Sequence, residues 1–157
     1  GKGVYSQTKI LGEIEDDANL TLRTSIIGPE LKDNGEGLFH WFMSQQGDIT
    51  GFTRAIWSGV TTLELVKAIK WSIENDITGL YHVTNNSSIS KYELLKLFQK
   101  HTKKDISIKS VDGKNVDKSF IDTRLLMNYQ IPSYDEMISD MASLIVNNRA
   151  LYSQYKI

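Results

Sequence analysis

Apolar residues recur every three or four positions in several stretches of the chain, the spacing that places side chains on one face of a helix. The longest stretch follows Thr61 and Thr62, either of which can cap a helix at its N-terminus. It runs to about Glu74, and its predicted apolar stripe consists of Leu63, Val66, Ile69 and Ile73. Further helices are predicted at about residues 4–17, 38–46 and 134–147, and one that Ser88 or Ser90 can cap runs to about His101.

Short runs that alternate in polarity, or are wholly apolar, lie between these helices and predict strands. Residues 20–27 alternate and then become apolar, as expected of a strand in a parallel sheet, and Gly28-Pro29 ends the run. Shorter strands are predicted at residues 49–52, 55–57, 80–83 and 106–111, and residues 114–124 form a polar linker. Because strands alternate with helices, the pattern predicts an α/β fold.

The composition allows one hydrophobic core. The chain has 157 residues, of which 40% are hydrophobic and 24% charged, so a single domain is expected. The chain has 18 lysine and arginine residues and 19 acidic residues. It therefore has no excess of positive charge that would attract nucleic acid or an anionic membrane. Small-molecule chemistry fits this balance better.

Residue usage also limits the chemistry. The absence of cysteine excludes disulfides, thiolate metal sites and cysteine nucleophiles, and three scattered histidines have no metal-ligand spacing, so no metal is expected. There is no apolar run long enough to span a bilayer and no signal-peptide pattern at the start. A cytoplasmic protein is therefore expected.

Tyr5-Ser-Gln-Thr-Lys9 places a phenol and an ammonium one helical turn apart. Residues i and i+4 project from one helix face, so the Lys9 charge can favour ionisation of the phenol, which could then exchange a proton with a sugar hydroxyl or ketone. The spacing alone is weak evidence, because it recurs from Tyr92 to Lys96 and again at the C-terminal tip, from Tyr152 to Lys156. The second copy lies on a helix with an apolar core-facing stripe, and the third is explained by chance.

The neighbourhood of the first copy carries more information. Residues 5–13 and 19–29 resemble the second half of an extended short-chain dehydrogenase/reductase, the family of nucleotide-sugar reductases, epimerases and dehydratases. Residues 57–65, 79–83 and 89–95 resemble successive blocks of its dTDP-4-dehydrorhamnose reductase branch, in the same order. The resemblance implies the C-terminal portion of a Rossmann-like doubly wound sheet plus the small substrate-binding subdomain.

The resemblance also implies roles for residues in the first 30 positions. Tyr5 would be the general acid, and Lys9 would support it and hold the nicotinamide ribose hydroxyls. Thr24, Ser25 and Ile26 match positions where family members approach the nicotinamide, although Thr24 stands where many relatives have proline. A plain strand end remains the alternative for Thr24 and Ser25.

Three candidates for substrate binding lie further along the chain. Arg54 could pair with a sugar-nucleotide diphosphate, since guanidinium presents a fork of donors, but it could equally face solvent. Lys118 falls where relatives often carry a basic residue near the substrate phosphates, and Trp57 could stack on a ring. Trp41 is expected in the core, and His82 is expected to be a buried histidine with satisfied hydrogen bonds.

The glycine-rich turn that holds a dinucleotide diphosphate is missing from this sequence. No G-x-G-x-x-G occurs, and the cluster at Gly35 and Gly37 has no apolar strand directly before it, so a simple turn is predicted there. Residues 1–157 are therefore predicted to be one domain from the C-terminal part of a longer enzyme. In it, residues 1–30 would supply the catalytic helix and a core strand, and residues 31–157 mostly the substrate-binding region.

Several functional expectations follow. The parent would be an NAD(P)-dependent oxidoreductase that reduces a 4-keto nucleotide sugar, with NAD or NADP held mainly by the absent half and none bound to this chain alone. An epimerase or dehydratase on the same scaffold, or a non-catalytic sugar-nucleotide-binding module, are the alternatives. Self-association is expected through the Tyr5 helix or an exposed sheet edge, because removing the other half would bare apolar surface.

Overall fold

The computed structural model describes residues 3–122 and 128–157 of the chain, which form a mixed α/β fold. The helices are α1 (Val4–Leu11), α2 (Leu38–Ser44), α3 (Thr62–Glu74), α4 (Lys91–Thr102) and α5 (Tyr134–Asn147). The strands are β1 (Leu20–Arg23), β2 (Ile26–Ile27), β3 (Asp48–Phe52), β4 (Ala55–Trp57), β5 (Val60–Thr61), β6 (Gly79–His82), β7 (Ile89–Ser90), β8 (Ser107–Val111) and β9 (Val116–Lys118).

The strands form small, mostly parallel groups. β1 pairs with β6, β2 with β5, and β3 with β8, each in parallel. β4 lies between β7, which runs antiparallel to it, and β9, which runs parallel. The α/β class predicted from the alternating pattern is therefore confirmed, and the sheet around β1 is as thin as two strands.

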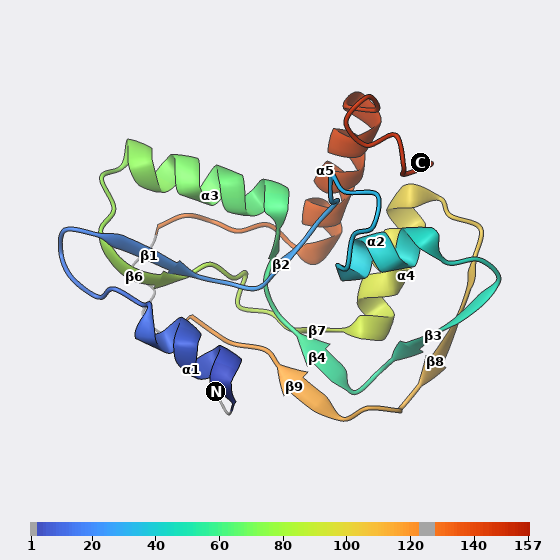
Figure 1. Cartoon of the computed structure of the whole chain (residues 1–157), viewed down its shortest axis with the longest axis horizontal. Helices are drawn as coiled ribbons and strands as arrows, with labels where there is room; N and C mark the ends of the chain where they lie inside the picture. The colour runs from blue at the N-terminus through green and yellow to red at the C-terminus, as the bar shows by residue number, and fades with distance from the viewer. Residues whose placement is uncertain (1–2, 123–127) are drawn as a thin grey trace.

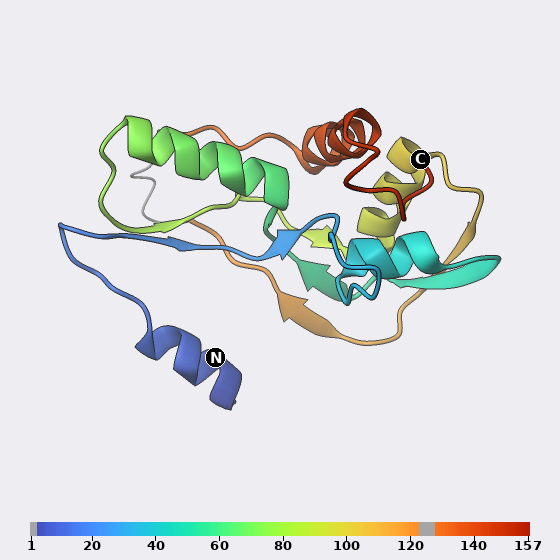
Figure 2. The ribbon, with the colours of Figure 1, turned by 45° about the horizontal axis from the view of Figure 1, so that its top comes forward.

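The helices divide between two parts of the molecule (Figure 1). α1 and α3 lie on opposite sides of the β1–β6 pair, and this is clearest when the molecule is tilted (Figure 2). α4 and α5 pack against each other at the other end, with α2 beside α4. α1 lies on one side of the β1–β6 pair without covering it, since none of its residues is buried.

The main core lies between α2, α4 and α5. Phe39 and Phe98 meet edge to face with ring centroids 5.2 Å apart, and both are fully buried. Phe42 packs on the same Phe98 ring at 5.6 Å. Replacing a fully buried aromatic residue of this size with alanine lowers the free energy of unfolding by about 3–5 kcal/mol.

Side-chain caps explain where the long helices begin. Ser90 and Ser133 each form a capping box, in which the serine hydroxyl accepts the N–H of the glutamate three residues on and that glutamate accepts the serine N–H. Thr61 caps α3 by accepting the N–H of Glu64. The predicted starts of these three helices, and the full extent of α5, are confirmed.

The first helix is shorter than predicted and ends at Leu11 rather than near Asp17. The Asp16 carboxylate accepts the backbone N–H groups of Ala18 and Asn19, at 2.9 and 2.7 Å, so the acidic run forms a turn instead of continuing the helix. The next strand is interrupted as well. β1 pairs with β6 and β2 with β5, and between them Thr24 donates its hydroxyl to the carbonyl of Val83 at 2.9 Å.

The predicted orientation of α3 was wrong. Its buried residues are Glu64, Ala68 and Ser72, whereas Val66 and Ile73 are 61% and 70% exposed. The expectation for Trp41 was also wrong, because its side chain is 39% exposed while its neighbours on α2 are buried. In both cases the periodicity identified a helix, but the residues opposite it in space decided which face is covered.

Two further segments differ from expectation. The predicted linker contains β9, although residues 123 and 124 at its end lie outside the described part of the chain. The C-terminal tip, where the third Tyr-x-x-x-Lys copy lies, is packed onto the core: Tyr155 is buried, and its hydroxyl accepts the N–H of Glu30 at 3.0 Å and lies 2.9 Å from His40 Nδ1.

Candidate active site

Tyr5 and Lys9 lie on the same side of α1, as their spacing predicts. The Lys9 ammonium is 5.8 Å from the centroid of the Tyr5 ring, a distance at which the cation is attracted to the ring face. Tyr5 is 76% exposed, so its hydroxyl is open to a molecule from outside the chain. In the second copy, by contrast, Lys96 donates to Gln99 at 2.7 Å.

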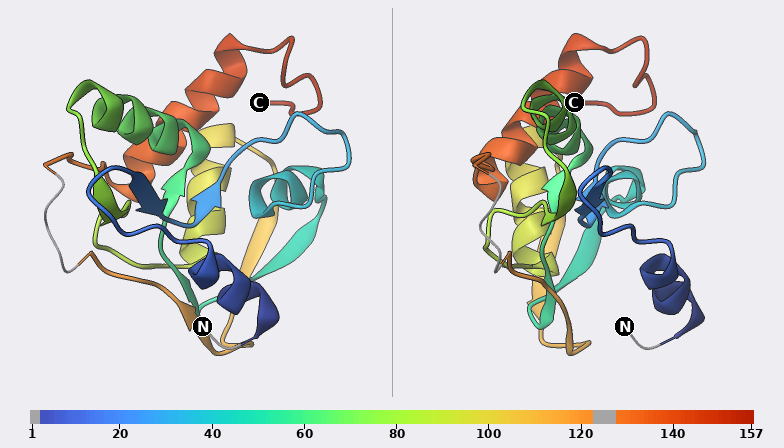
Figure 3. Two further views of the ribbon diagram at one scale, coloured as in Figure 1. Left: turned by 60° about the vertical axis from the view of Figure 1, so that its left-hand side comes forward. Right: turned by 90° about the vertical axis from the view of Figure 1, so that its left-hand side faces the viewer.

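α1 has little support from the rest of the described chain. None of its residues is buried, and it stands apart from the other elements when viewed from the side (Figure 3). Two contacts anchor the segment that follows it: an ion pair of 3.0 Å between Glu13 and Arg23, and a hydrogen bond of 2.7 Å from the Thr21 hydroxyl to the carbonyl of Ile14. The structure therefore does not bring the Tyr5–Lys9 pair against the other predicted site residues.

Thr24 and Ser25 lie where β1 ends, beside the end of β6. Ligands of open parallel sheets bind outside the carboxyl ends of the strands, so this is the expected edge for a site. A small cavity of about 220 Å³ is found there, lined by Arg23, Thr24, Ser25, His82 and Phe120. Ile26, the third residue of the predicted set, follows on β2 and is 52% exposed.

The turn between β4 and β5 packs directly on this loop. The N–H of Val60 donates to the carbonyl of Ser25 at 2.9 Å. A Cβ atom placed on Gly59 would lie 2.1 Å from that carbonyl oxygen and 2.5 Å from the Trp57 ring. Only glycine allows the two backbones to approach so closely. The Trp57-Ser58-Gly59 block therefore fixes the position of the Ser25 loop.

Lys118 is brought to the same region through the strand pair β4–β9, in which it is the register partner of Trp57. Trp57 is partly buried, and its ring packs on Tyr134 with centroids 5.9 Å apart. Next to Lys118, the hydroxyl of Ser119 holds the pKa of the Asp117 carboxyl below its ordinary value, with help from the Ser119 N–H. The structure thus groups Ser25, Trp57 and Lys118 at one edge, with Lys118 exposed there.

Arg54 lies apart from this group. It precedes β4, at the end opposite Trp57, and its guanidinium forms an ion pair of 3.0 Å with Asp112. Both side chains are more than half exposed, so the pair is solvated and contributes little stability. The solvent-facing alternative considered for Arg54 describes its position in this structure.

His82 was interpreted from the sequence as a plain buried histidine, but it lines the cavity at the edge. Its imidazole Nδ1 lies 3.8 Å from Asp122, and its ring packs on Phe120 at 5.9 Å. It also borders a second, polar cavity of about 450 Å³ lined by Thr84, Asn85, Asn86 and Asp122 together with residues 128–131. The signal that could have indicated this place is a polar residue at the end of a parallel strand.

The glycine cluster before α2 is a simple turn, as predicted. The Glu30 carboxylate accepts the N–H of Gly37 at 2.6 Å and so occupies the N-terminus of α2. A carboxylate in that place would repel the diphosphate of a dinucleotide.

Two other features bear on the class of function. Among residues 3–122 and 128–157, no three histidine, aspartate or glutamate side chains are placed to hold a metal ion together. Within the same ranges, no helix has the length and apolar character needed to cross a membrane.

Comparison with known proteins identifies the class of this fold. No protein-family model matches the sequence, and no curated protein matches it. Solved structures do match. A dTDP-4-dehydrorhamnose reductase from Bacillus anthracis, in complex with NADP, aligns over 78% of this chain with a TM-score of 0.62 and 21% identity. The alignment covers 47% of the reductase chain.

Two enzymes with other activities match similarly well. A UDP-N-acetylglucosamine 4-epimerase from Methanobrevibacter ruminantium, in complex with UDP-N-acetylmuramic acid, aligns over 91% of this chain and 50% of its own, with a TM-score of 0.61 and 19% identity. A dTDP-glucose 4,6-dehydratase from Bacillus anthracis, in complex with NAD, aligns over 85% of this chain and 46% of its own, with a TM-score of 0.59 and 12% identity.

These matches define the fold. The chain spans about half the length of the similar enzymes, and it has the Rossmann-like α/β fold of the half that it matches. The resemblance inferred from the sequence motifs is thereby confirmed at the level of the fold, which nucleotide-sugar reductases, epimerases and dehydratases share.

Proposed function

We propose that this chain is the catalytic-helix and substrate-binding portion of an NAD(P)-dependent oxidoreductase that reduces a 4-keto nucleotide sugar. The observation that carries the proposal is the Tyr5–Lys9 pair, exposed on one face of α1, in a chain whose fold matches half of a dTDP-4-dehydrorhamnose reductase. In this proposal Tyr5 protonates the ketone oxygen as hydride reaches the carbonyl carbon, and Lys9 supports the phenol electrostatically.

The proposal assigns residues of this chain to one end of the cofactor. Lys9 and the loop of Thr24, Ser25 and Ile26 would hold the nicotinamide riboside, and the cofactor, when bound, supplies the hydride. The N-terminus of α2, which follows the glycine cluster, offers no place for the diphosphate, because the Glu30 carboxylate occupies it. We therefore expect this chain alone to bind neither NAD nor NADP appreciably and to be inactive.

For the substrate we propose the edge formed by Trp57 and Lys118. Lys118 is exposed and can meet a phosphate of the nucleotide sugar, while the half-buried ring of Trp57 borders the same strand pair. Arg54 was proposed for the diphosphate as well. Its exposed ion pair with Asp112 would have to open for it to reach a substrate, so we assign it the lesser part.

An epimerase or dehydratase is the second candidate. The observation in its favour is coverage: two UDP-N-acetylglucosamine 4-epimerases align over 91% and 90% of this chain, against 78% for the reductase from Bacillus anthracis. In that reaction the same tyrosine would first remove a proton from a sugar hydroxyl instead of giving one to a ketone.

The test is made on the full-length gene product with two nucleotide-linked sugars, one that carries a 4-keto group and one that carries a 4-hydroxyl. A reductase consumes one NAD(P)H for each sugar, whereas an epimerase interconverts sugars with no net cofactor consumption. Binding of the sugar nucleotide with neither reaction would indicate a non-catalytic module and would contradict the proposal.

The catalytic assignment is tested in the same assay by Tyr5→Phe, which removes one hydroxyl. Turnover should fall by about 10²–10⁴-fold, the usual contribution of a general acid. In this chain alone the substitution should leave stability unchanged, because Tyr5 is exposed on a helix with no buried residue. Tyr92→Phe is the matched control and should leave turnover unchanged. Equal effects of the two substitutions would show that the wrong Tyr-x-x-x-Lys copy has been assigned.

A further inference from the structure

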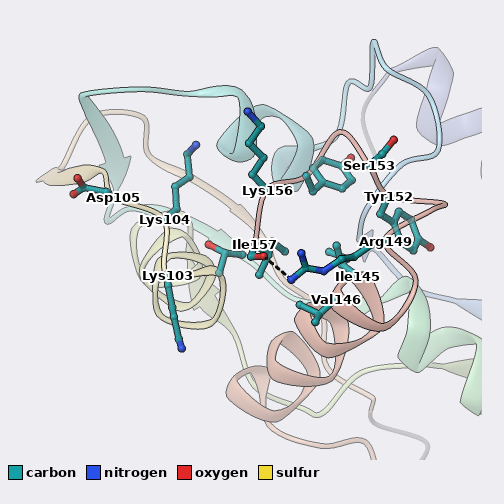
Figure 4. Close-up of a pocket in the computed structure, with 12 residues that line it drawn as sticks. Lys103, Lys104, Asp105, Ile145, Val146, Arg149, Tyr152, Ser153, Lys156 and Ile157 are labelled. Atoms are coloured by element: carbon teal, nitrogen blue, oxygen red, sulfur yellow. Dashed lines mark hydrogen bonds between the residues drawn. The ribbon is translucent and has the colours of Figure 1, made fainter.

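A large cavity of about 720 Å³ lies at the end of the molecule formed by the last turns of α4 and α5 and the C-terminal tail (Figure 4). It is separate from the candidate active site, since it shares no residue with the cavity at the Ser25 loop. Its volume is within the range of small-molecule sites in proteins, about 300–1,000 Å³.

Four cationic side chains line this cavity, contributed by Lys103, Lys104, Arg149 and Lys156, and Asp105 is the acidic residue among its lining residues. No ion pair involves any of the four within the described part of the chain. Lys67, Lys70, Lys100 and Lys109, elsewhere on the surface, are each paired with a carboxylate. In a chain whose charges nearly balance, this cavity therefore concentrates positive charge that the protein itself leaves uncompensated.

The ends of the two helices do not account for this charge. α4 and α5 both end at the cavity, and a helix C-terminus carries about half a negative charge. Arg149 can be counted as occupied, because it donates to the carbonyl of Ile157 at 3.4 Å. The three lysines carry three positive charges. Asp105 and the two helix ends together offset about two of them, so about one positive charge remains.

The lysines lie on different sides of the cavity. The amines of Lys104 and Lys156 point to one side, away from Arg149, and Lys103 points to the opposite side (Figure 4). Lys104 also donates to the carbonyl of Met43 at 2.9 Å. A second cavity of about 450 Å³ is lined by Lys103, Arg149 and Ile157 as well. The Arg149–Ile157 hydrogen bond thus lies between two adjoining cavities, with lysine available to an anion in both.

The wall of the larger cavity is built on the core and is not a loose surface. Tyr155 is buried, and Gln154 next to it donates to the carbonyl of Glu30, so the tail is held across the chain. The remaining lining includes the partly buried ring of Tyr152 and the side chains of Ile145 and Val146. Cations and an apolar wall therefore meet in one preformed space.

We propose that this cavity binds a phosphorylated small molecule, with a terminal phosphate between Lys104 and Lys156 and the organic part against Tyr152 and Val146. Phosphate suits the donors, because ammonium groups form charge-assisted hydrogen bonds to its oxygens. The size suits a body as large as a sugar or nucleoside, since a phosphate ion alone would leave most of the 720 Å³ unfilled.

The proposal is tested on this chain by calorimetry with three probes: inorganic phosphate, glucose 1-phosphate and UMP. Glucose 1-phosphate or UMP should bind more tightly than inorganic phosphate, and its affinity should fall as salt rises. Tighter binding of UMP than of glucose 1-phosphate would identify the nucleotide as the source, and the reverse order the sugar phosphate. Equal affinity for all three probes would overturn the role given to the organic part.

Variants locate the binding. Lys104→Gln and Lys156→Gln should each weaken binding about tenfold, the loss expected for one charge-assisted contact. Lys32→Gln and Lys114→Gln, at other exposed lysines, are the matched controls and should leave affinity unchanged. Equal losses in all four variants, or no binding of any probe at about 10 mM, would overturn the proposal. Failure here would leave the Tyr5 assignment untouched, because that assignment rests on turnover.

Discussion

The side chain of Ser58 bonds to both backbone groups of Phe120, 62 residues away in sequence. Its hydroxyl accepts the Phe120 N–H at 2.7 Å and donates to the Phe120 carbonyl at 3.1 Å. Ser58 is fully buried, so these bonds are shielded from water. They attach the segment after β9 to the turn that supports the Ser25 loop, and thereby assemble the candidate substrate edge.

Ser58→Ala should therefore be costly. The substitution leaves the Phe120 N–H without its acceptor, and an unsatisfied buried donor costs about 1–3 kcal/mol. Urea unfolding should show this loss. Ser110→Ala, at an exposed position on β8, should change stability by no more than about 0.5 kcal/mol. A Ser58 variant as stable as this control would show that the Phe120 contact does not hold the edge together.

Gly59→Ala tests the close approach of the two backbones at the Ser25 loop. The added methyl would lie 2.1 Å from the Ser25 carbonyl oxygen, so either the turn or the loop must move. Overpacking of this kind costs about 1–3 kcal/mol, and here it displaces backbone. The control is Gly12→Ala, whose methyl would meet its nearest atoms at 3.7 Å. Thermal unfolding of the two variants should differ by several degrees, and coinciding curves would contradict the geometry.

Acid should destabilise the chain partly through Glu93. The Ser90 hydroxyl, followed by the Ser90 N–H, holds the pKa of Glu93 below its ordinary value of 4.5. Because the folded pKa is depressed, this stability is present above pH 4.5 and is lost as the pH falls through the folded pKa. Glu93→Gln should lower the urea midpoint at pH 7, and the difference from the wild type should shrink below pH 4.5.

The matched control for this pH profile is Glu36→Gln, in the exposed loop before α2. Its midpoint should follow that of the wild type at every pH. If the Glu93 and Glu36 variants had parallel profiles, the capping box would not be the source of the acid dependence.

Self-association remains a prediction. Ile10, Leu11 and Ile14 are 49%, 84% and 50% exposed, and they precede β1, which pairs with β6 alone among the described strands. Light scattering should therefore show mass rising with concentration. Leu11→Glu should reduce the rise, whereas Leu151→Glu, at a residue 60% exposed at the other end of the molecule, should not. A monodisperse monomer at high concentration would contradict the prediction.

Local signals predicted the elements well. The starts of α3, α4 and α5 follow from capping residues that act within three positions, and β4 has the predicted bounds. Long-range contacts decided what local signals missed. The break after β1 coincides with a change of partner strand from β6 to β5, and the exposed face of α3 depends on which elements lie opposite that helix.

The candidate site shows the same division. The motifs singled out Ser25, Trp57 and Lys118 one by one, but their proximity results from a strand pairing and from the Gly59 contact, which no local pattern encodes. The place of His82 in the cavity was missed because its apolar strand suggested simple burial. Its position at the strand end becomes part of the cavity wall through Phe120, which packs against its ring. The catalytic roles of these residues stay predictions.

The anchoring of Tyr155 has a consequence for synthesis of the chain. Its hydroxyl bonds to Glu30 across 125 residues, and its ring covers Phe39 of α2 at 5.4 Å. A ribosome that adds about 5–20 residues per second needs roughly 6–25 s to pass from the first partner to the second. During that interval one face of α2 lacks its final cover, so a nascent chain that stalls in α5 should present this aromatic surface to chaperones.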